Sequence, residues 1–180
     1  MLGRRYRCVL VAFATLFATL FPTGACGQTR EYALKAEFLE RFTQFVDWPK
    51  EAFPDPGAAF VLCVVGQNPF GSLLEEMARA RRFGRRRGEV RYLGDLARLH
   101  ECHLVWVSRA EKHTLDVVLA QTGGRPILTV GDTPGYAEAG VLINFFIEQD
   151  RIRFEINHLA AQRGGLVFSS QLLRLARVVP

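Results

Sequence analysis

The sequence predicts an α/β fold: a single-domain sandwich with a mostly parallel sheet, flanked by helices and completed by a C-terminal β-hairpin plus helix. Three short runs, Phe60–Val65, Cys102–Ser108 and Pro126–Val130, are almost continuously apolar, as is typical of strands that are covered on both faces. Helical patterns separate these runs, which favours parallel pairing through right-handed crossovers. A chain of 180 residues accommodates one such domain.

Residues 1–27 have the pattern of a secretory signal peptide. Three basic residues precede the apolar run Cys8–Phe21, and a proline and several small residues follow it; this is the order that signal peptides show. The run has 14 residues, fewer than the roughly 20 that a membrane-spanning helix needs. We therefore expect a cleaved signal and an exported mature domain at 28–180.

Two cleavage positions are open. Cleavage after Gly27 would leave Gln28 first and remove an unpaired thiol, and we prefer it for that reason. Cleavage after Ala25 would expose Cys26, which follows a weak lipobox-like sequence and would make the protein a lipoprotein.

Removal of the signal changes the charge balance. Of the 23 Lys and Arg residues, three lie in this segment and none of the 18 acidic residues does, so 20 basic residues remain against 18 acidic ones. A nearly neutral protein offers no general case for nucleic-acid binding.

Two cysteines remain after processing, Cys63 and Cys102. In an oxidising compartment they are expected to form a disulfide, which would close a loop of about 40 residues and stabilise the fold by roughly 4 kcal/mol in the chain-entropy model. Two buried free thiols are the alternative.

The first element is an amphipathic helix over Arg30–Val46. Leu34, Phe38, Phe42 and Phe45 recur at helical spacing, and the helix is expected to end before Pro49. Trp48 and Phe53 follow in a loop, where we expect them to cap the core; an exposed partner-binding patch is the alternative.

The loop Gly66–Gly71 follows the first strand and precedes a helix that reaches about Ala80. Asn68 is suited to the N-cap of this helix and Pro69 to its first position. The loop has no Gly-x-Gly-x-x-Gly, and Ser72 stands where a P-loop needs lysine, so both nucleotide-binding motifs are absent.

Six arginines lie within Arg79–Arg87. Such a cluster could bind phosphate, an anionic membrane surface or an acidic partner. A solvated helix end and turn is the interpretation we favour, because cations are stabilised at a helix C-terminus.

The remaining elements are short. We expect strands at Glu89–Leu93, Leu142–Glu148 and Arg151–Ile156, the last two as a hairpin about Gln149 and Asp150, and helices at Glu111–Ala120, His158–Arg163 and Ser169–Ala176.

In a parallel sheet, the loops after the strands share one edge, which is the usual ligand position. The polar side chains expected there are Asn68, Ser108 and Asp132, and we add Glu138 from the loop Gly131–Glu138 and, less directly, Arg109. They form our candidate ligand or partner loop.

No catalytic, cofactor or metal site is predicted. His100, Cys102 and His103 suggest zinc, but residues 102 and 103 would face opposite sides of a strand, and a disulfide would consume the thiolate. No Gly-x-Ser-x-Gly elbow is present. Asp132 with Glu138 or Glu155 could be paired carboxylates, but capping and salt bridging are the commoner roles.

The chain resembles the YfiR-like family of small periplasmic proteins from Tyr32 to Ala176. The strings that carry the resemblance are YALKAEFLERFTQFVDWP at 32–49, FVLCVVGQNPFG at 60–71, ILTVGDTPGYAEAGVLINFFIEQDRIRFEIN at 127–157, and AAQRGGLVFSSQLLRLA at 160–176. The resemblance implies that Cys63 and Cys102 form a structural disulfide. A further Cys pair of some members is missing here at Ala137 and Asn144.

This resemblance implies a non-enzymatic regulator, often dimeric, that binds the periplasmic sensing domain of an inner-membrane diguanylate cyclase and represses cyclic-di-GMP synthesis. A possible homodimer and a related membrane sensor are therefore the expected partners. A periplasmic small-molecule or peptidoglycan-fragment binding protein is the alternative.

Overall fold

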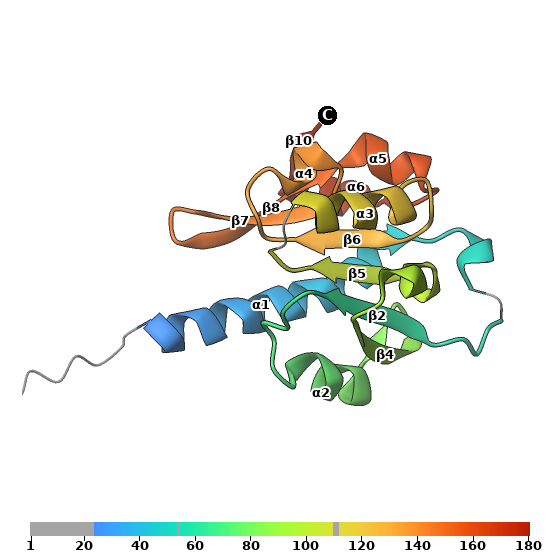
Figure 1. Cartoon of the computed structure of the whole chain (residues 1–180), viewed down its shortest axis with the longest axis horizontal. Coiled ribbons are helices and arrows are strands. Elements are labelled where there is room, and N and C mark those ends of the chain that lie inside the picture. Colours follow the sequence, from blue (N-terminus) through green and yellow to red (C-terminus); the bar gives the residue numbers. More distant parts are fainter. Residues whose placement is uncertain (1–23, 54, 110–111) are drawn as a thin grey trace, which may run out of the picture.

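The computed structural model describes residues 24–53, 55–109 and 112–180, which form one α/β domain around an eight-stranded sheet (Figure 1). The strand order is β10-β8-β7-β6-β5-β2-β4-β3. The five strands from β4 to β7 are joined by parallel pairings, β8 is antiparallel to β7, and β3 is antiparallel to β4. The predicted fold class is confirmed.

The strands of this sheet are β2 (Phe60–Val65), β3 (Arg82–Phe83), β4 (Arg86–Leu93), β5 (Leu104–Val107), β6 (Leu128–Gly131), β7 (Ile143–Glu148), β8 (Arg151–Asn157) and β10 (Arg177–Val179). A separate two-stranded antiparallel pair joins β1 (Val46–Asp47) to β9 (Val167–Phe168).

The helices are α1 (Gly24–Phe45), α2 (Leu73–Ala80), α3 (Lys112–Thr122), α4 (Tyr136–Ala139), α5 (His158–Arg163) and α6 (Ser170–Leu175), with 3₁₀ turns η1 (Lys50–Ala52) and η2 (Leu96–Glu101). The predicted helix at Glu111–Ala120 corresponds to α3, and that at Ser169–Ala176 to α6 with Ser169 as its N-cap.

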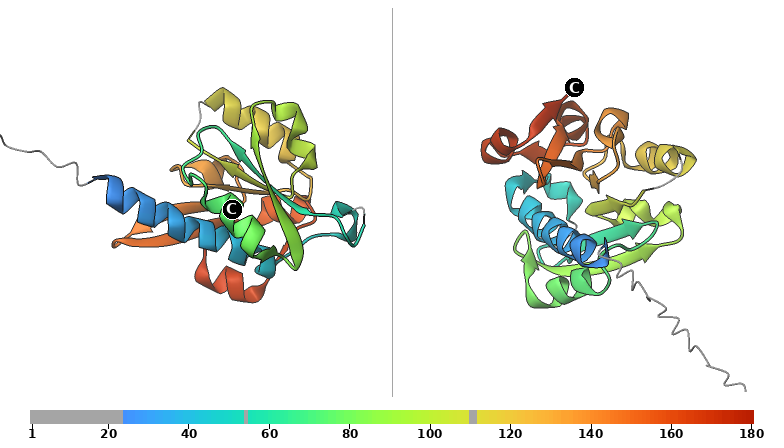
Figure 2. Two further views of the ribbon diagram at one scale, coloured as in Figure 1. Left: turned by 90° about the horizontal axis from the view of Figure 1, so that it is seen from below. Right: turned by 90° about the vertical axis from the view of Figure 1, so that its left-hand side faces the viewer.

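Both faces of the central sheet are covered, so its strands are apolar throughout. Along β2, Phe60, Leu62 and Val64 belong to one core and the residues between them to the other. The first core packs under α1, α2 and α6, and the second under η2 and α3. Figure 2 shows α1 and α3 on opposite sides of the sheet. This burial explains why β2 matches the predicted strand at both ends.

Helix α1 packs most of its predicted apolar face on the core: Phe42 is buried, and Phe38 and Phe45 pack against the core cluster. Leu34 is the exception, at 48% exposed. The buried positions also include Ala36, Leu39 and Lys35, which is only 3% exposed. Lys35 lies on the buried face of α1, where the apolar pattern does not predict it, because periodicity arguments count lysine as a surface residue.

The predicted N-cap at Asn68 is wrong. Helix α2 begins at Leu73, and the Asn68 side chain closes a turn before it: Oδ1 accepts from the Phe70 amide at 2.9 Å, and Nδ2 donates to the Gly71 carbonyl at 2.7 Å. Asparagine readily forms such side-chain turns in loops, and here this turn occupies the space between β2 and the helix.

The hairpin of β7 and β8 is confirmed, with Gln149 and Asp150 as its turn. Both have positive φ, 50° and 57°, the combination that a two-residue type I′ hairpin turn requires. The short strands β1, β3, β9 and β10 are not predicted by the sequence, since two or three residues cannot establish a pattern.

Candidate functional site

Residues after the carboxyl ends of three parallel strands line one cavity of about 320 Å³, the strand-end pocket. Gln67 and Asn68 follow β2, Ser108 and Arg109 follow β5, and Asp132 follows β6. Helix α1 contributes Tyr32 and the core contributes Trp106. The sheet topology therefore brings together Asn68, Ser108, Asp132 and Arg109, as the sequence suggested.

Asp132 connects this pocket to α1. Its Oδ2 accepts from the Tyr32 hydroxyl at 2.9 Å and from Lys35 Nζ at 2.6 Å, and Lys35 also pairs with Glu31 at 2.5 Å. Burial, then the hydrogen bond to Asp132, raises the pKa of Tyr32 above its ordinary value. Asp132 thus has the salt-bridging role that the sequence favoured over paired-carboxylate chemistry.

Ser108 and Asn68 have their polar groups occupied within the protein. Ser108 Oγ donates to the Gln67 carbonyl at 2.5 Å and accepts from Trp106 Nε1 at 3.1 Å. Asn68 Nδ2 also donates to the Tyr92 hydroxyl. These residues shape the wall of the pocket. The Ser108 hydroxyl donates to a backbone carbonyl, and among the described residues no histidine or carboxylate accepts from it as a general base would.

The structure separates Glu138 from the other predicted residues. It is exposed on α4 and does not line the strand-end pocket. Arg109 is exposed at the pocket, and no hydrogen bond or ion pair joins its side chain to another described residue. Arg109 is therefore the group there that remains available for an anionic ligand.

The disulfide between Cys63 and Cys102 is present. Cys63 lies in the middle of β2 and Cys102 directly after η2, with Cα atoms 6.0 Å apart. Both cysteines are buried in the core on the α3 side of the sheet. The bond therefore fastens η2 to the central strand.

No metal site is found among the described residues, within which no three His, Cys, Asp or Glu side chains are placed to hold an ion. Cys102 is in the disulfide, and His103 uses both ring nitrogens: Nδ1 accepts from the Val61 amide at 3.0 Å, and Nε2 donates to the Ala52 carbonyl at 3.0 Å.

The arginine cluster is divided by a turn. Arg81 pairs with Glu37 at 2.5 Å, whereas Arg86 donates to the carbonyls of Asp55, Pro56 and Ala58 and lies 3.9 Å above the Phe53 ring. Arg85 lies between them in the turn with a φ of 74°. Arg81 and Arg86 therefore have separate structural roles, and Arg85 lies in the turn between β3 and β4.

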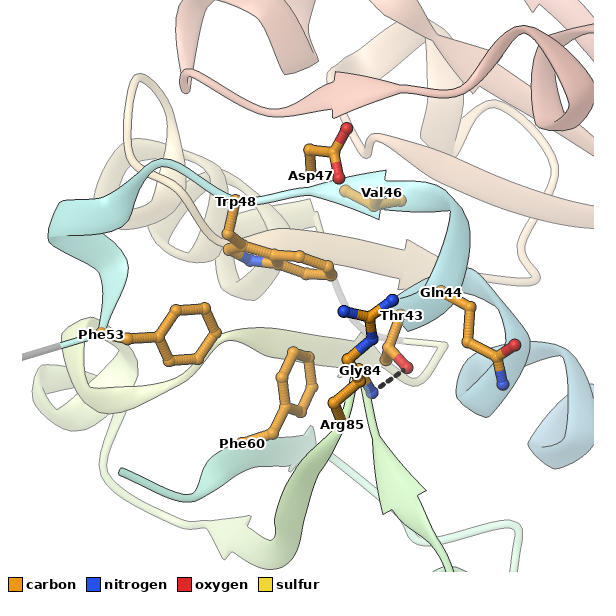
Figure 3. A pocket seen from close by; sticks show the side chains of 9 residues that line it. All are labelled: Thr43, Gln44, Val46, Asp47, Trp48, Phe53, Phe60, Gly84 and Arg85. Carbon is orange, nitrogen blue, oxygen red and sulfur yellow. Dashed lines mark hydrogen bonds between the residues drawn. The ribbon is translucent and has the colours of Figure 1, made fainter. Parts of the chain in front are cut away.

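A second cavity of about 730 Å³ lies at the opposite edge of the sheet, where β2 and β4 begin. We call it the aromatic pocket. Its lining residues are Thr43, Gln44, Val46, Asp47, Trp48, Phe53, Phe60, Gly84 and Arg85 (Figure 3). Trp48 is perpendicular to Phe60 with ring centroids 5.2 Å apart. Trp48 and Phe53 do pack on the core as expected, but the sequence did not predict that they also line a cavity.

Among the described residues, no helix combines the length and the apolar character needed to cross a bilayer. The signal-peptide prediction falls mainly on residues 1–23, which lie outside the described residues, and the preferred cleavage point after Gly27 falls within α1. Cleavage and export remain predictions.

Comparison with protein families identifies one match, the YfiR/HmsC-like family, over residues 32–177. No curated protein matches the chain in a sequence search. The family match covers nearly the whole described domain, from the third turn of α1 to the first residue of β10. This chain therefore belongs to the YfiR/HmsC-like family.

Proposed function

We propose that the protein is a non-enzymatic periplasmic regulator that binds and represses the periplasmic sensing domain of an inner-membrane diguanylate cyclase or of a related membrane signalling protein. The family match over residues 32–177 carries this proposal, because the family is one of periplasmic regulators. The match supports a regulator in general. A diguanylate cyclase as the partner is the more specific part of the proposal, and it needs the experimental test.

The distribution of exposed apolar side chains supports a role in protein binding. Of the seven large apolar side chains exposed in the described residues, four come from the last part of the chain: Leu159, Val167, Leu175 and Val178. They are 54%, 58%, 69% and 54% exposed, respectively. Figures 1 and 2 show α5, α6 and β10 gathered at one end of the molecule. Exposed apolar groups are typical of an interaction surface where they adjoin one another, so we take this end of the molecule as the first surface to test.

The disulfide favours a protein that works outside the cytoplasm. Cys63 and Cys102 are bonded, and such bonds persist chiefly in oxidising compartments. This supports the proposal of a periplasmic mature protein, exported by cleavage near Gly27, with a lipoprotein anchored at Cys26 as the alternative.

A gene deletion with complementation tests the regulatory function. Loss of the protein should raise the cellular level of cyclic-di-GMP, and reintroduction of the wild-type gene should return it to the original level. A membrane pull-down identifies the partner directly. Unchanged cyclic-di-GMP and no captured membrane signalling protein would together contradict the proposal.

A matched pair of variants tests the exposed end as the binding surface. Leu175→Ser removes the most exposed apolar side chain of this group and should weaken capture of the partner without a change in melting temperature. Leu34→Ser, also an exposed leucine but on α1, is the control and should bind normally. If both variants changed capture of the partner equally, the binding surface would not lie at the end formed by α5, α6 and β10.

A second function, small-molecule binding, is favoured by the strand-end pocket and the free guanidinium of Arg109. A thermal-shift screen of anionic metabolites and peptidoglycan fragments tests it. Stabilisation that disappears in Arg109→Ala would support this function, and no stabilisation by any compound argues against it. Arg163→Ala is a suitable control, because Arg163 is exposed and lies outside this pocket.

A further inference from the structure

An apolar groove lies between α1 and α6, which contact each other. Six apolar side chains from α1, β8 and α6 line it: Phe38, Phe42, Phe45, Phe154, Leu172 and Leu175. We call it the phenylalanine groove. It adjoins the end of the molecule formed by α5, α6 and β10, because α6 belongs to both.

The aromatic rings of the groove are packed against one another. Phe42 and Phe154 are 1% and 5% exposed, with ring centroids 5.2 Å apart. Phe38 lies 6.0 Å from each of them. Rings that are already held in place lose little conformational freedom when a ligand arrives, so the groove is preorganised to receive an apolar group.

The size of the groove favours a side chain over a whole small molecule. Its volume is about 240 Å³, below the roughly 300–1,000 Å³ that small-molecule sites occupy. Large apolar side chains that insert into well-packed pockets are the usual anchors of protein interfaces. The groove therefore fits an anchor residue of another protein better than it fits a metabolite or a lipid chain.

Two arginines give the groove a positive rim. Arg41 of α1 is among its lining residues, and Arg174 lies within one turn of Leu175 on α6. Both are exposed, and no hydrogen bond or ion pair joins either side chain to another described residue. These guanidinium groups are available to an occupant of the groove.

Nearby acidic groups do not balance this charge. The described lining of the groove contains no acidic side chain. On the neighbouring positions of α1, Glu37 pairs with Arg81 at 2.5 Å, and Glu40 is 8% exposed and accepts from Gln44 at 2.7 Å. The groove is thus apolar inside and cationic at its edge.

This combination selects the charge of the occupant. A side chain that enters the groove covers part of Arg41, and a guanidinium that is removed from water without a partner is costly. A carboxylate beside the inserted side chain would pair with the planar guanidinium by two parallel hydrogen bonds. The same pairing steers an acidic partner toward the groove.

We propose that the phenylalanine groove binds an acidic segment of the partner protein, with one large apolar side chain inserted between α1 and α6 and a carboxylate paired with Arg41. The inference rests on the proposed function in one respect, namely that the chain acts by binding another protein. It adds the place of contact and the chemistry of the partner segment.

Photo-crosslinking from within the groove tests this inference. Gln171 lines the groove on α6, is exposed, and forms no hydrogen bond with another described residue, so a photo-reactive phenylalanine analogue can replace it. Irradiation of cells that produce the full chain should join it to a partner protein. Mass spectrometry of the joined peptide should show Asp or Glu close in sequence to a large apolar residue.

Position 79 provides the matched control for the crosslinker. Arg79 is exposed on α2 and lies outside the groove. The same analogue placed there should not give the product that position 171 gives. A product common to both positions would reflect random collision and would count against the groove.

Charge reversal tests the role of Arg41. With the analogue at position 171, Arg41→Glu should lower the yield of the product by about tenfold or more, the effect of losing a charged hydrogen bond. Arg87→Glu makes the same change in net charge at an exposed arginine of β4 outside the groove, and it should leave the yield unchanged. Both variants should keep the wild-type melting temperature, because both side chains are exposed.

Three outcomes would overturn the inference. The first is no product from position 171. If deletion of the gene nevertheless raises cyclic-di-GMP, the regulatory function stands and only the groove is lost; an unchanged level removes both. The second is a product with a lipid, with a second copy of this chain, or with a segment that has no acidic residue. The third is an equal yield from Arg41→Glu and Arg87→Glu.

Discussion

His103 lies directly before β5, where hydrogen bonds and ring stacking hold its side chain in place. Besides its two ring hydrogen bonds, it stacks on Phe53 at 4.4 Å and on Phe60 at 5.3 Å between ring centroids. The bond from the Val61 amide to Nδ1 requires an unprotonated nitrogen, so the ring is neutral. Burial lowers the pKa of His103 below its ordinary value, and the charges of Arg86 and Arg91 lower it further, against an opposing effect of the Ala52 carbonyl.

This arrangement predicts a pH-dependent stability. Because the folded protein binds the proton more weakly than the unfolded chain, the free energy of unfolding is highest above the ordinary histidine pKa of about 6.5 and falls as the pH drops below it toward the folded pKa. Denaturant unfolding at about pH 7.5 and pH 5 measures the loss.

His103→Phe keeps a stacking ring but cannot titrate, so this part of the pH dependence should disappear. The same variant should be less stable at neutral pH by about 1–3 kcal/mol, since the Val61 amide loses its acceptor. His100→Gln, at an exposed histidine, should behave as the wild type does; a pH dependence lost there instead would show that His103 is not the titrating group.

Lys35 is the buried cation of the α1 interface, with a side chain 4% exposed beside an Asp132 side chain 12% exposed. Lys35→Met should destabilise the protein by about 3 kcal/mol, because Asp132 would keep its charge without a cation. Arg81→Ala breaks the exposed pair with Glu37 and should hardly change stability. Chemical denaturation of the two variants compares them, and similar losses would contradict the assigned difference.

At the scale of elements, the disulfide joins the regular strand β2 to the end of the 3₁₀ turn η2. Replacing Cys63 and Cys102 together with serine should lower the free energy of unfolding by about 2–5 kcal/mol, since the bond constrains the unfolded chain over a separation of 39 residues. Unfolding with and without reductant measures this. Reductant should lower the free energy of unfolding of the wild type and leave that of the double variant unchanged. If reductant with access to the unfolded wild-type chain left the free energy of unfolding unchanged, the prediction would be contradicted.

The β7–β8 turn is the second element with a measurable consequence. Asp150 has a φ of 57°, a conformation that costs less for glycine. Asp150→Gly should therefore raise the melting temperature slightly, because the left-handed conformation costs a non-glycine residue roughly 1 kcal/mol or more, and the greater freedom of glycine in the unfolded chain offsets only part of that gain. Arg151→Gly, one position later in β8, should instead destabilise the hairpin, because glycine weakens a strand interior.

At the scale of the molecule, topology was the most predictable property. Continuous apolar runs correctly indicated β2, β5 and β6, and the rule that loops after parallel strands share an edge placed Asn68, Ser108 and Asp132 together. That reasoning failed where a side chain belongs to a network: Lys35 is buried because two carboxylates pair with it, which no pattern along α1 reveals.

The aromatic pocket was beyond sequence reasoning for a different reason. Trp48, Phe53 and Arg85 are close in space only because β1 pairs with β9 and β3 with β4. Strands β1, β3 and β9 have two residues each, too few for a pattern in the sequence to indicate a strand. The charge cluster did contain one clue, since the Gly84–Arg85 step interrupts it with a residue pair suited to a tight turn.

Helix α1 extends past both pockets. Tyr32 lines the strand-end pocket and Thr43 the aromatic pocket, which are separated along the helix axis by about 16 Å at 1.5 Å per residue. Both pockets therefore have a wall on the same helix, and a ligand that shifted α1 at one pocket would also shift a wall of the other. Ligands in the two pockets would then be thermodynamically coupled, and the factor by which each changed the affinity of the other would be the same.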